Sequence, residues 1–254
     1  MTLVYDRLLL GVGIAHLLLG VACFVLLQVD AAPILGVHPA VKPLKFATSI
    51  AAFLVTMAVL VPSLSVSEGT RRLLAGALSL SMIVEMIAIG TQALRGRRSH
   101  FNNEQPFDAA LTSSMFIAIV VMLLAMSLIA LIATARPLAQ PPLLTAAFRA
   151  ALGIFLFAAV SGLGMGNRGR HTIGGADGGP GMAMTNWSTT YGDLRVSHFF
   201  SLHALQILPL LAVVLARLPL GVTLQWTMLV LGVAANALLA GGTWLQALAA
   251  RPVW

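Results

Sequence analysis

Residues 109–133 read AALTSSMFIAIVVMLLAMSLIALIA, about 25 consecutive residues without a charge. An α-helix rises about 1.5 Å per residue, so a helix of this length exceeds the ~30 Å hydrocarbon core of a bilayer. Comparable apolar runs lie on both sides of this one, at about 8–28, 46–63, 73–94, 143–164, 197–216 and 221–248. The sequence therefore predicts an all-α fold: a polytopic transmembrane helix bundle of about seven transmembrane helices, in a single domain over residues 1–254.

The composition agrees with a membrane protein. Only 9% of the 254 residues are charged and 59% are hydrophobic, whereas a soluble domain carries roughly 25% charged residues. The expected partner of this surface is the lipid bilayer. The formal net charge of +7 comes from basic residues in short loops. The positive-inside bias and anionic lipid headgroups account for such residues, so no nucleic acid is expected.

Residue usage indicates the source of the chain and the kinds of cysteine site that it can form. Arginine greatly outnumbers lysine, and alanine and leucine are abundant. This usage is typical of GC-rich bacterial genomes, so the expected location is the bacterial cytoplasmic (inner) membrane. The single cysteine, Cys23, excludes an internal disulfide and a cysteine-based zinc or iron–sulfur site.

Two connections between the apolar runs are long. One covers residues 95–108, and the other is a glycine-rich loop over residues 164–196. With seven spans, both lie at the same membrane face as the connection at 29–45 and the C-terminus. Basic residues are somewhat more numerous at this face, which weakly favours a cytoplasmic location for it.

Glu85 is the only acidic residue deep in any span. At 100° per residue, Ser81, Glu85 and Gln92 share one face of the third helix. A carboxyl group at that depth is expected to be protonated unless a cation neutralises it, and to face protein or water rather than lipid. It is a candidate acid/base group, or alternatively a hydrogen-bonding partner for a neighbouring helix.

The start of the sixth span is the richest polar segment. Asp193 is expected to cap the helix, and Arg195, His198, His203 and Gln206 then lie within an arc of about 140°. The first span similarly aligns Gly13, His16, Gly20 and Cys23, and the seventh aligns Gln225, Gly232, Asn236 and Thr243. Small and polar residues on one face are typical of helix packing in membranes.

Metal and haem binding stay open. His198 and His203 are five residues apart, so the favourable i,i+4 spacing for two histidines on one ion is absent. A divalent metal would need one of them together with Glu85 or with a loop histidine such as His100. A haem between His16 and His203 is the other alternative. The sequence contains no haem-attachment, phosphate-loop, nucleophile-elbow or zincin motif.

Three segments carry a resemblance. They are KPLKF at 42–46, SHFN at 99–102 and WSTTYGDLRVSHFFSLHALQ at 187–206. With these segments the chain resembles a family of uncharacterised bacterial multi-pass integral membrane proteins. The resemblance covers most of the chain and implies a membrane class and a bacterial origin, but no activity.

The shared face suggests a function. We expect the polar segments to converge on a one-sided pocket, with cationic groups for a polar or anionic head and apolar helices for a hydrophobic tail. The hypothesis is a membrane-embedded enzyme acting on a lipophilic small molecule, with Glu85, His198 or His203 as acid/base, with or without a metal. The predicted substrate-binding residues are Lys42, Lys45, Gln92, Arg95, His100, Asn102, Trp187, Asp193, Arg195 and Gln206; the predicted metal ligands are His198, His203 and His100.

Two alternatives remain beside this hypothesis. One is a non-catalytic protein: a haem- or metal-binding redox or sensor subunit, or a small carrier. The other is that the buried polar groups only hold helices together. The sequence chooses neither a reaction type nor an oligomeric state.

Overall fold

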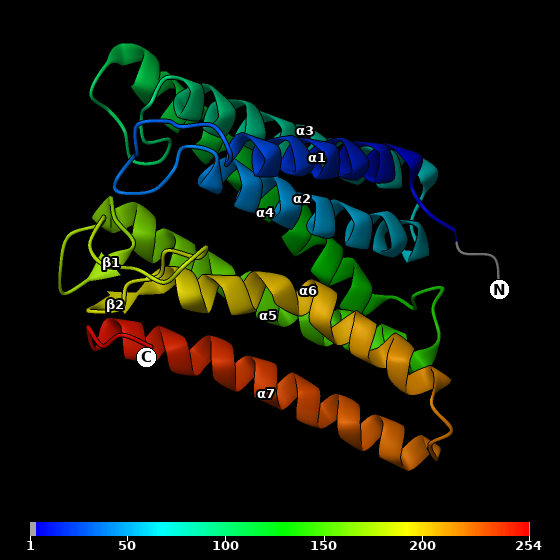
Figure 1. Cartoon of the computed structure of the whole chain (residues 1–254). Coiled ribbons are helices and arrows are strands. Elements are labelled where there is room, and N and C mark those ends of the chain that lie inside the picture. The colour runs from blue at the N-terminus through cyan, green and yellow to red at the C-terminus, as the bar shows by residue number, and fades with distance from the viewer. Residues whose placement is uncertain (1–3, 254) are drawn as a thin grey trace. The chain divides into compact units, whose positions relative to one another are not determined.

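The computed structural model describes residues 4–253 (Figure 1). Its helices are α1 (Arg7–Leu26), α2 (Val41–Leu60), α3 (Glu68–Leu94), α4 (Pro106–Ala135), α5 (Pro142–Arg168), α6 (Leu194–Arg217) and α7 (Val222–Leu248). A 3-10 turn η1 (Val61–Ser63) follows α2, and two short strands, β1 (Thr172–Ile173) and β2 (Gly192–Asp193), pair antiparallel. Within the described residues, seven helices are long and apolar enough to cross a membrane. The predicted fold class is confirmed.

The start of α2 differs from the prediction. The helix begins at Val41, so Lys42 and Lys45 lie in its first turns and not in the preceding connection. Pro43 is the third helical residue, where the missing N–H costs no intrahelical hydrogen bond. Pro43 and Leu44 are both buried, so the packed part of α2 begins before the predicted span.

The glycine-rich connection is shorter than predicted. Helix α5 continues to Arg168 and α6 begins at Leu194, so the connection covers 169–193 rather than 164–196. Gly164 and Gly166 are helical. The helix ends at Gly169, whose φ of 60° is the left-handed conformation that favours glycine after a helix. Glycine content alone placed this boundary too early, because glycine is tolerated in a helix at a cost of about 1 kcal/mol.

The chain divides into two compact units, the first up to Ile129 and the second from Ala130. The first unit holds α1, α2, α3 and most of α4; the second holds α5, α6, α7 and the strand pair. The grouping of the whole chain into one transmembrane domain stays a prediction.

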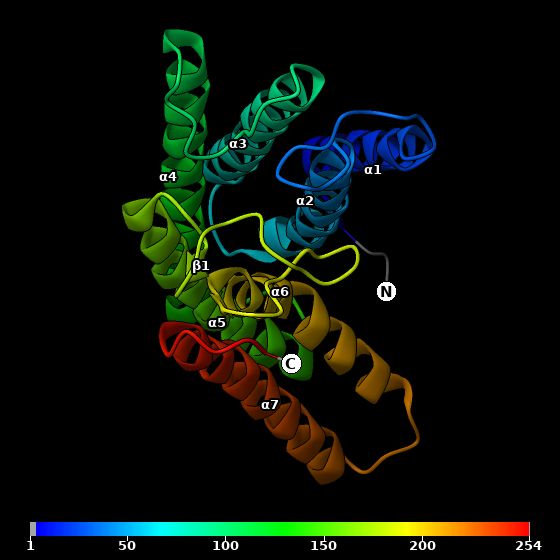
Figure 2. The ribbon, with the colours of Figure 1, turned by 60° about the vertical axis from the view of Figure 1, so that its left-hand side comes forward.

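In the first unit, α1 packs along α2 through small residues (Figures 1 and 2). Gly13, His16, Gly20 and Cys23 are all buried, so the face predicted for this helix is confirmed. A Cβ added at Gly20 would lie 3.0 Å from Cγ2 of Thr48, and one at Gly13 would lie 3.3 Å from Cγ2 of Val55. The two backbones therefore approach as closely as glycine allows.

In the second unit, α6 packs against both α5 and α7. The Ser197 hydroxyl donates to the carbonyl oxygen of Ala240 at 2.7 Å and so links α6 to α7. On α7, Asn236 and Thr243 are buried as the helix-packing pattern predicts. Ring contact between Phe157 and Trp244, with centroids 5.8 Å apart, links α5 to α7.

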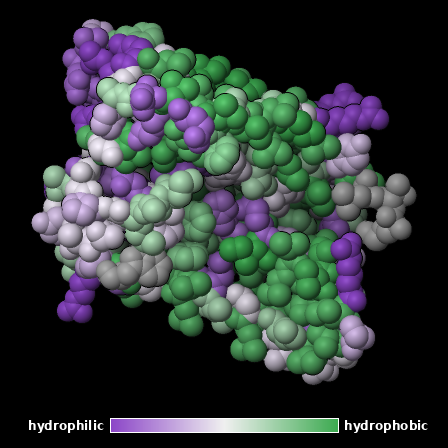
Figure 3. Space-filling view, in the orientation of Figure 1, coloured by the Kyte–Doolittle hydropathy of each residue, from purple (hydrophilic) through white to green (hydrophobic). Residues whose placement is uncertain are grey.

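The outer surfaces of the helices are apolar. Large side chains such as Leu18 on α1, Leu124 on α4 and Leu238 on α7 are more than 60% exposed. Apolar residues cover much of the helical surface in Figure 3, and hydrophilic residues gather at the loop that joins α3 to α4. This distribution is the one expected of helices whose outer faces contact lipid.

The α1–α2 contact gives a stability prediction. We expect Gly20→Leu to lower the free energy of unfolding by about 1–3 kcal/mol, because the larger side chain must displace Thr48. Gly11 on the same helix has open space around its Cβ position and is the matched control, so Gly11→Leu should be neutral. Thermal unfolding in detergent measures both variants. Equal losses at the two positions would contradict the described packing.

Candidate functional site

A polar pocket lies in the first unit, where α3 ends. The hollow has a volume of about 530 Å³ and is lined by two segments of chain. The lining residues are Pro33, Ile34, Leu35, Arg95, Gly96, Arg97, Arg98, Asn102 and Glu104. We call it the arginine pocket. It combines three guanidinium groups with an apolar wall.

The apolar wall is a tight turn. Ile34 and Val37 exchange backbone hydrogen bonds of 2.9 and 3.1 Å, and the two residues between them, Leu35 and Gly36, both have positive φ. This is the arrangement of a primed two-residue turn. Glycine adopts it easily, whereas a leucine at φ 49° is unusual. The turn leaves the Leu35 side chain about half exposed at the pocket.

The arginines follow directly from the way α3 ends. Gly96 is left-handed with φ 65°, its N–H donates to Ala93 O at 3.1 Å, and the N–H of Arg97 donates to Gln92 O at 2.9 Å. These two bonds form a Schellman motif. It reverses the chain within one turn and places Arg95, Arg97 and Arg98 around the end of the helix.

Asp108, which is not among the predicted site residues, holds Arg95 and Arg97. Its side chain is fully buried and accepts hydrogen bonds from Nε2 of Gln92 at 2.9 Å, from Nη1 of Arg97 at 3.3 Å and from Nη1 of Arg95. Asp108 lies in the first turn of α4, a position that favours carboxylates, and directly follows the arginine-rich loop. Those two signals were available in the sequence.

The pocket holds more positive than negative charge. Arg95 pairs with Asp108, and Arg97 is shared between Asp108 and Glu104, at 3.3 and 3.2 Å. Arg98 is exposed and forms no ion pair with any carboxylate of the described residues. Its guanidinium group is therefore the strongest candidate for binding an anion here.

Asn102 shapes the loop rather than adding a donor. Its side-chain amide donates to Arg98 O at 3.1 Å, and its amide oxygen accepts from the N–H of Glu104 at 3.2 Å. The hydroxyl of Thr112 on α4 donates to the Asn102 carbonyl oxygen at 2.8 Å. Only 1% of Asn102 is exposed. The residue thus fixes the backbone from which Arg98 projects.

Lys42 and His100 form a second polar group in the same unit. Nζ of Lys42 donates to Nδ1 of His100 at 3.1 Å, and the Ser99 hydroxyl lies 3.1 Å from the same nitrogen. Because an ammonium group only donates, Nδ1 must accept, and the ring is a neutral imidazole with its proton on Nε2. Lys45, also predicted as a site residue, is half-buried one turn further along α2.

Glu85 lies deeper in α3 than the pocket. It is 2% exposed, and its Oε2 has no hydrogen-bond partner among the described residues. Ser81 and Gln92 on the same helix face are buried with it. Seven residues separate Glu85 from Gln92, which corresponds to about 10 Å along the helix axis.

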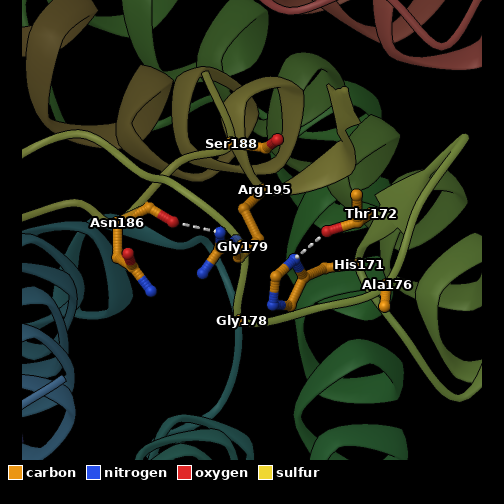
Figure 4. A pocket seen from close by; sticks show the side chains of 8 residues that line it. All are labelled: His171, Thr172, Ala176, Gly178, Gly179, Asn186, Ser188 and Arg195. Atoms are coloured by element: carbon orange, nitrogen blue, oxygen red, sulfur yellow. Dashed lines mark hydrogen bonds between the residues drawn. The ribbon is translucent and has the colours of Figure 1, made fainter. Parts of the chain in front are cut away.

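In the second unit, two carboxylates, Asp177 and Asp193, organise the connection between α5 and α6. Figure 4 shows their neighbours His171, Thr172 and Arg195. Asp177 accepts from the backbone N–H groups of Thr172 and His171 at 3.0 and 3.3 Å. Nδ1 of His171 lies 3.2 Å from Asp177 and 3.8 Å from Asp193. The hollow beside His171 and Arg195 has room for about one water molecule, and the cluster anchors the loop.

Asp193 caps α6, as predicted. It accepts from the backbone N–H of Arg195 at 3.0 Å and from that of Ser188 at 2.9 Å. The guanidinium group of Arg195 pairs with it at 2.6 Å and also reaches the carbonyl oxygen of Asn186. Burial alone would raise the pKa of Asp193. The hydrogen bonds and positive charge of Arg195, with the Ser188 N–H and His171, outweigh burial and lower that pKa.

The two histidines of α6 have different partners. Nδ1 of His198 donates to the carbonyl oxygen of Ala158 at 3.0 Å and lies 3.0 Å from the hydroxyl of Ser161 on α5. This places the proton of a neutral ring on Nδ1 and leaves Nε2 as the acceptor. Nδ1 of His203 hydrogen-bonds to Oε1 of Gln206 at 3.0 Å. Ser161 is fully buried, which is unsuited to a nucleophile.

Aromatic side chains surround the start of α6. Trp187, predicted as a substrate-binding residue, contacts the ring of Phe199 edge-on with centroids 5.5 Å apart. Phe199 in turn contacts His203, with centroids 4.4 Å apart. Trp187 thus belongs to the packing of this helix end.

The predicted metal ligands gain no support. Over residues 4–253, no group of three or more His, Cys, Asp or Glu side chains could hold a metal ion. His100 already directs Nδ1 at Lys42.

The predicted site residues divide between the units. The first unit holds Lys42, Lys45, Glu85, Gln92, Arg95, His100 and Asn102; the second holds Trp187, Asp193, Arg195, His198, His203 and Gln206. Within the first unit, Gln92, Arg95 and Asn102 are brought together around the arginine pocket. The convergence of all these residues on one cleft stays a prediction.

Comparisons of the chain with protein-family models, with curated proteins and with solved structures find no match. The multi-pass membrane character rests on the seven apolar helices. Any functional assignment must therefore be argued from the geometry of the site.

Asp193 gives a prediction for stability and pH. Asp193→Ala should lower the free energy of unfolding at pH 7 by about 3 kcal/mol, because it removes the cap and leaves the partly buried Arg195 unpaired. Asp193→Asn keeps a capping side chain and should lose less. Since folding lowers the pKa of Asp193, its stabilisation is present above the unfolded pKa of about 3.9 and is lost as pH falls through the folded-state pKa.

Thermal unfolding of the wild type and both variants, measured from pH 7 down to pH 3, checks this. The difference between wild type and Asp193→Asn should shrink only below about pH 4. A difference that stays constant to pH 3 would contradict the charge argument.

Proposed function

We propose that this protein is a membrane-embedded enzyme that acts on a lipophilic substrate with an anionic head, bound at the arginine pocket. The expected setting is the bacterial cytoplasmic membrane, on the strength of composition and of the resemblance in segments 42–46, 99–102 and 187–206. The reaction type is left open.

The observation that carries the proposal is the lining of the pocket. Arg98 has no carboxylate partner in the described chain, and Arg95 and Arg97 keep guanidinium N–H groups beyond those used by Asp108. Ile34 and Leu35 supply an apolar wall beside them. A volume of about 530 Å³ falls within the range of small-molecule sites. Charge and apolar surface side by side suit an amphipathic ligand.

Glu85 is the acid/base group that we favour. Its carboxyl group is buried inside the span and has one oxygen without a hydrogen-bond partner among the described residues. Buried carboxyl groups are typical of residues that exchange a proton during a reaction. His198 and His203 stay candidates of the second unit; of the two, His198 has the clearer tautomer, with Nε2 as acceptor.

The second candidate function is a non-catalytic binding protein. One observation favours it: the Ser161 hydroxyl, which hydrogen-bonds to His198, is fully buried and so offers no accessible nucleophile. In that case the arginine pocket would hold its ligand without turnover. Absorbance near the Soret band separates a haem-binding version of this alternative from the others.

The binding part of the proposal is tested at Arg98. We expect Arg98→Gln to weaken retention of an anionic phospholipid by about tenfold, since a hydrogen bond to a charged group contributes roughly 1.5–3 kcal/mol. Native mass spectrometry of the detergent-purified protein with phosphatidylglycerol measures this. Arg217, an exposed arginine at the end of α6, is the matched control. If Arg98→Gln and Arg217→Gln weakened lipid retention equally, the arginine pocket would not be a specific binding site for the lipid head.

The catalytic part is tested at Glu85. Incubation of the wild type with anionic amphiphiles, followed by mass spectrometry of the lipid extract, should reveal a product that Glu85→Gln does not form. The variant should still bind the amphiphile, because Glu85 lies outside the residues that line the pocket. Binding that depends on Arg98 without any product from the wild type would favour the non-catalytic alternative.

A further inference from the structure

We infer that the arginine pocket selects a head that carries a single negative charge, such as a phosphodiester or a carboxylate, over a doubly charged phosphate monoester. The inference rests on the proposed function, because it names the substrate class of the same site. It follows from the charges that the described residues place around the pocket.

The pocket carries an unbalanced charge of one. Arg95, Arg97 and Arg98 contribute three positive charges, and two carboxylates pair with them: Asp108, which is fully buried, and Glu104. Three minus two leaves one positive charge, and the pairing assigns it to Arg98. Asp108 does not line the pocket but is counted because it contacts Arg95 and Arg97 directly, whereas Lys42 does not line the pocket and donates to His100.

A singly charged head would neutralise this excess. A dianionic head would reverse it and leave a net negative charge against the apolar wall of Pro33, Ile34 and Leu35. An uncompensated charge near apolar surface is unfavourable because it loses water without gaining a partner. Asp108 cannot move away to relieve the repulsion, since three hydrogen bonds fix it behind the arginines.

Glu104 is the residue that sets the selectivity. It takes up part of the charge of Arg97 at 3.2 Å, and its side chain is about 60% exposed, so it can be changed without opening the core. Glu104→Gln removes one negative charge and raises the excess from one to two. The same pocket should then accept a dianion.

The experiment compares lipids that differ in head charge. Phosphatidylglycerol, phosphatidate and phosphatidylcholine are mixed in equal amounts with the detergent-purified protein, and native mass spectrometry counts the lipid retained. The pH is 8, above the second pKa of about 6 of a phosphate monoester. We expect the wild type to retain phosphatidylglycerol over both other lipids. In Glu104→Gln the ratio of phosphatidate to phosphatidylglycerol should rise by about fivefold or more.

The matched control is Glu68→Gln. Glu68 is also an exposed carboxylate paired with an arginine, Arg72 at 3.0 Å, but it lies at the opposite end of α3 from the pocket. Its substitution should leave the lipid ratio unchanged. Equal shifts in Glu104→Gln and Glu68→Gln, or a wild type that retains phosphatidate as well as phosphatidylglycerol, would overturn the inference.

Two further measurements, competition by a soluble head and retention by Arg98→Gln, show which part of the proposal fails. Soluble glycerophosphoglycerol has the same head without acyl chains, and it should displace phosphatidylglycerol far less well than intact lipid does. If the soluble head displaced phosphatidylglycerol as well as intact lipid does, the ligand would not be a membrane lipid. If Arg98→Gln changes no retention at all, the proposed binding function fails; if retention depends on Arg98 but not on Glu104, only the charge selectivity fails.

Discussion

The buried carboxylate of Asp108 is the constraint on which the first unit's polar end depends. A charged group removed from water is costly unless its oxygens are hydrogen-bonded, and Asp108 meets this requirement through Gln92, Arg95 and Arg97. These bonds join the start of α4 to the end of α3 and to the loop between them. The loop geometry and the free guanidinium of Arg98 follow from that junction.

The second unit also contains a buried carboxylate that pairs with an arginine at the start of a helix. Asp193 is nearly fully buried at the start of α6, and Arg195 pairs with it at 2.6 Å. In both units a carboxylate at the start of a helix, the N-cap Asp193 or the first-turn Asp108, pairs with arginine. A helix N-terminus stabilises the negative charge through its free N–H groups. Each unit thus fixes a long polar connection to a helix end that sits beside an apolar, lipid-facing surface.

The sequence predicted the helices well and the pocket only in part. Runs of uncharged residues predict membrane spans because length and hydrophobicity are enough to define them, and the buried face of α1 follows from helical spacing alone. Gln92, Arg95 and Asn102 were selected from residue type. The apolar wall of the pocket was not predicted. It depends on a turn in which Leu35 has a left-handed backbone conformation, and leucine rarely adopts that conformation. Asp108 was not predicted because it lies at a helix end and not inside a span, where its position in the sequence does not indicate burial.

The distance between head and acid/base group restricts the chemistry of the proposed enzyme. Gln92 marks the level of the Asp108 junction, and Glu85 lies about 10 Å deeper along α3. A charged head held by Arg98 at the helix end therefore cannot be the group on which Glu85 acts. The reacting bond must lie several atoms from the charge, toward the apolar end of the substrate. This separation makes binding and catalysis independent in the proposal: loss of Arg98 weakens capture of the head, whereas loss of Glu85 stops the reaction and leaves capture intact.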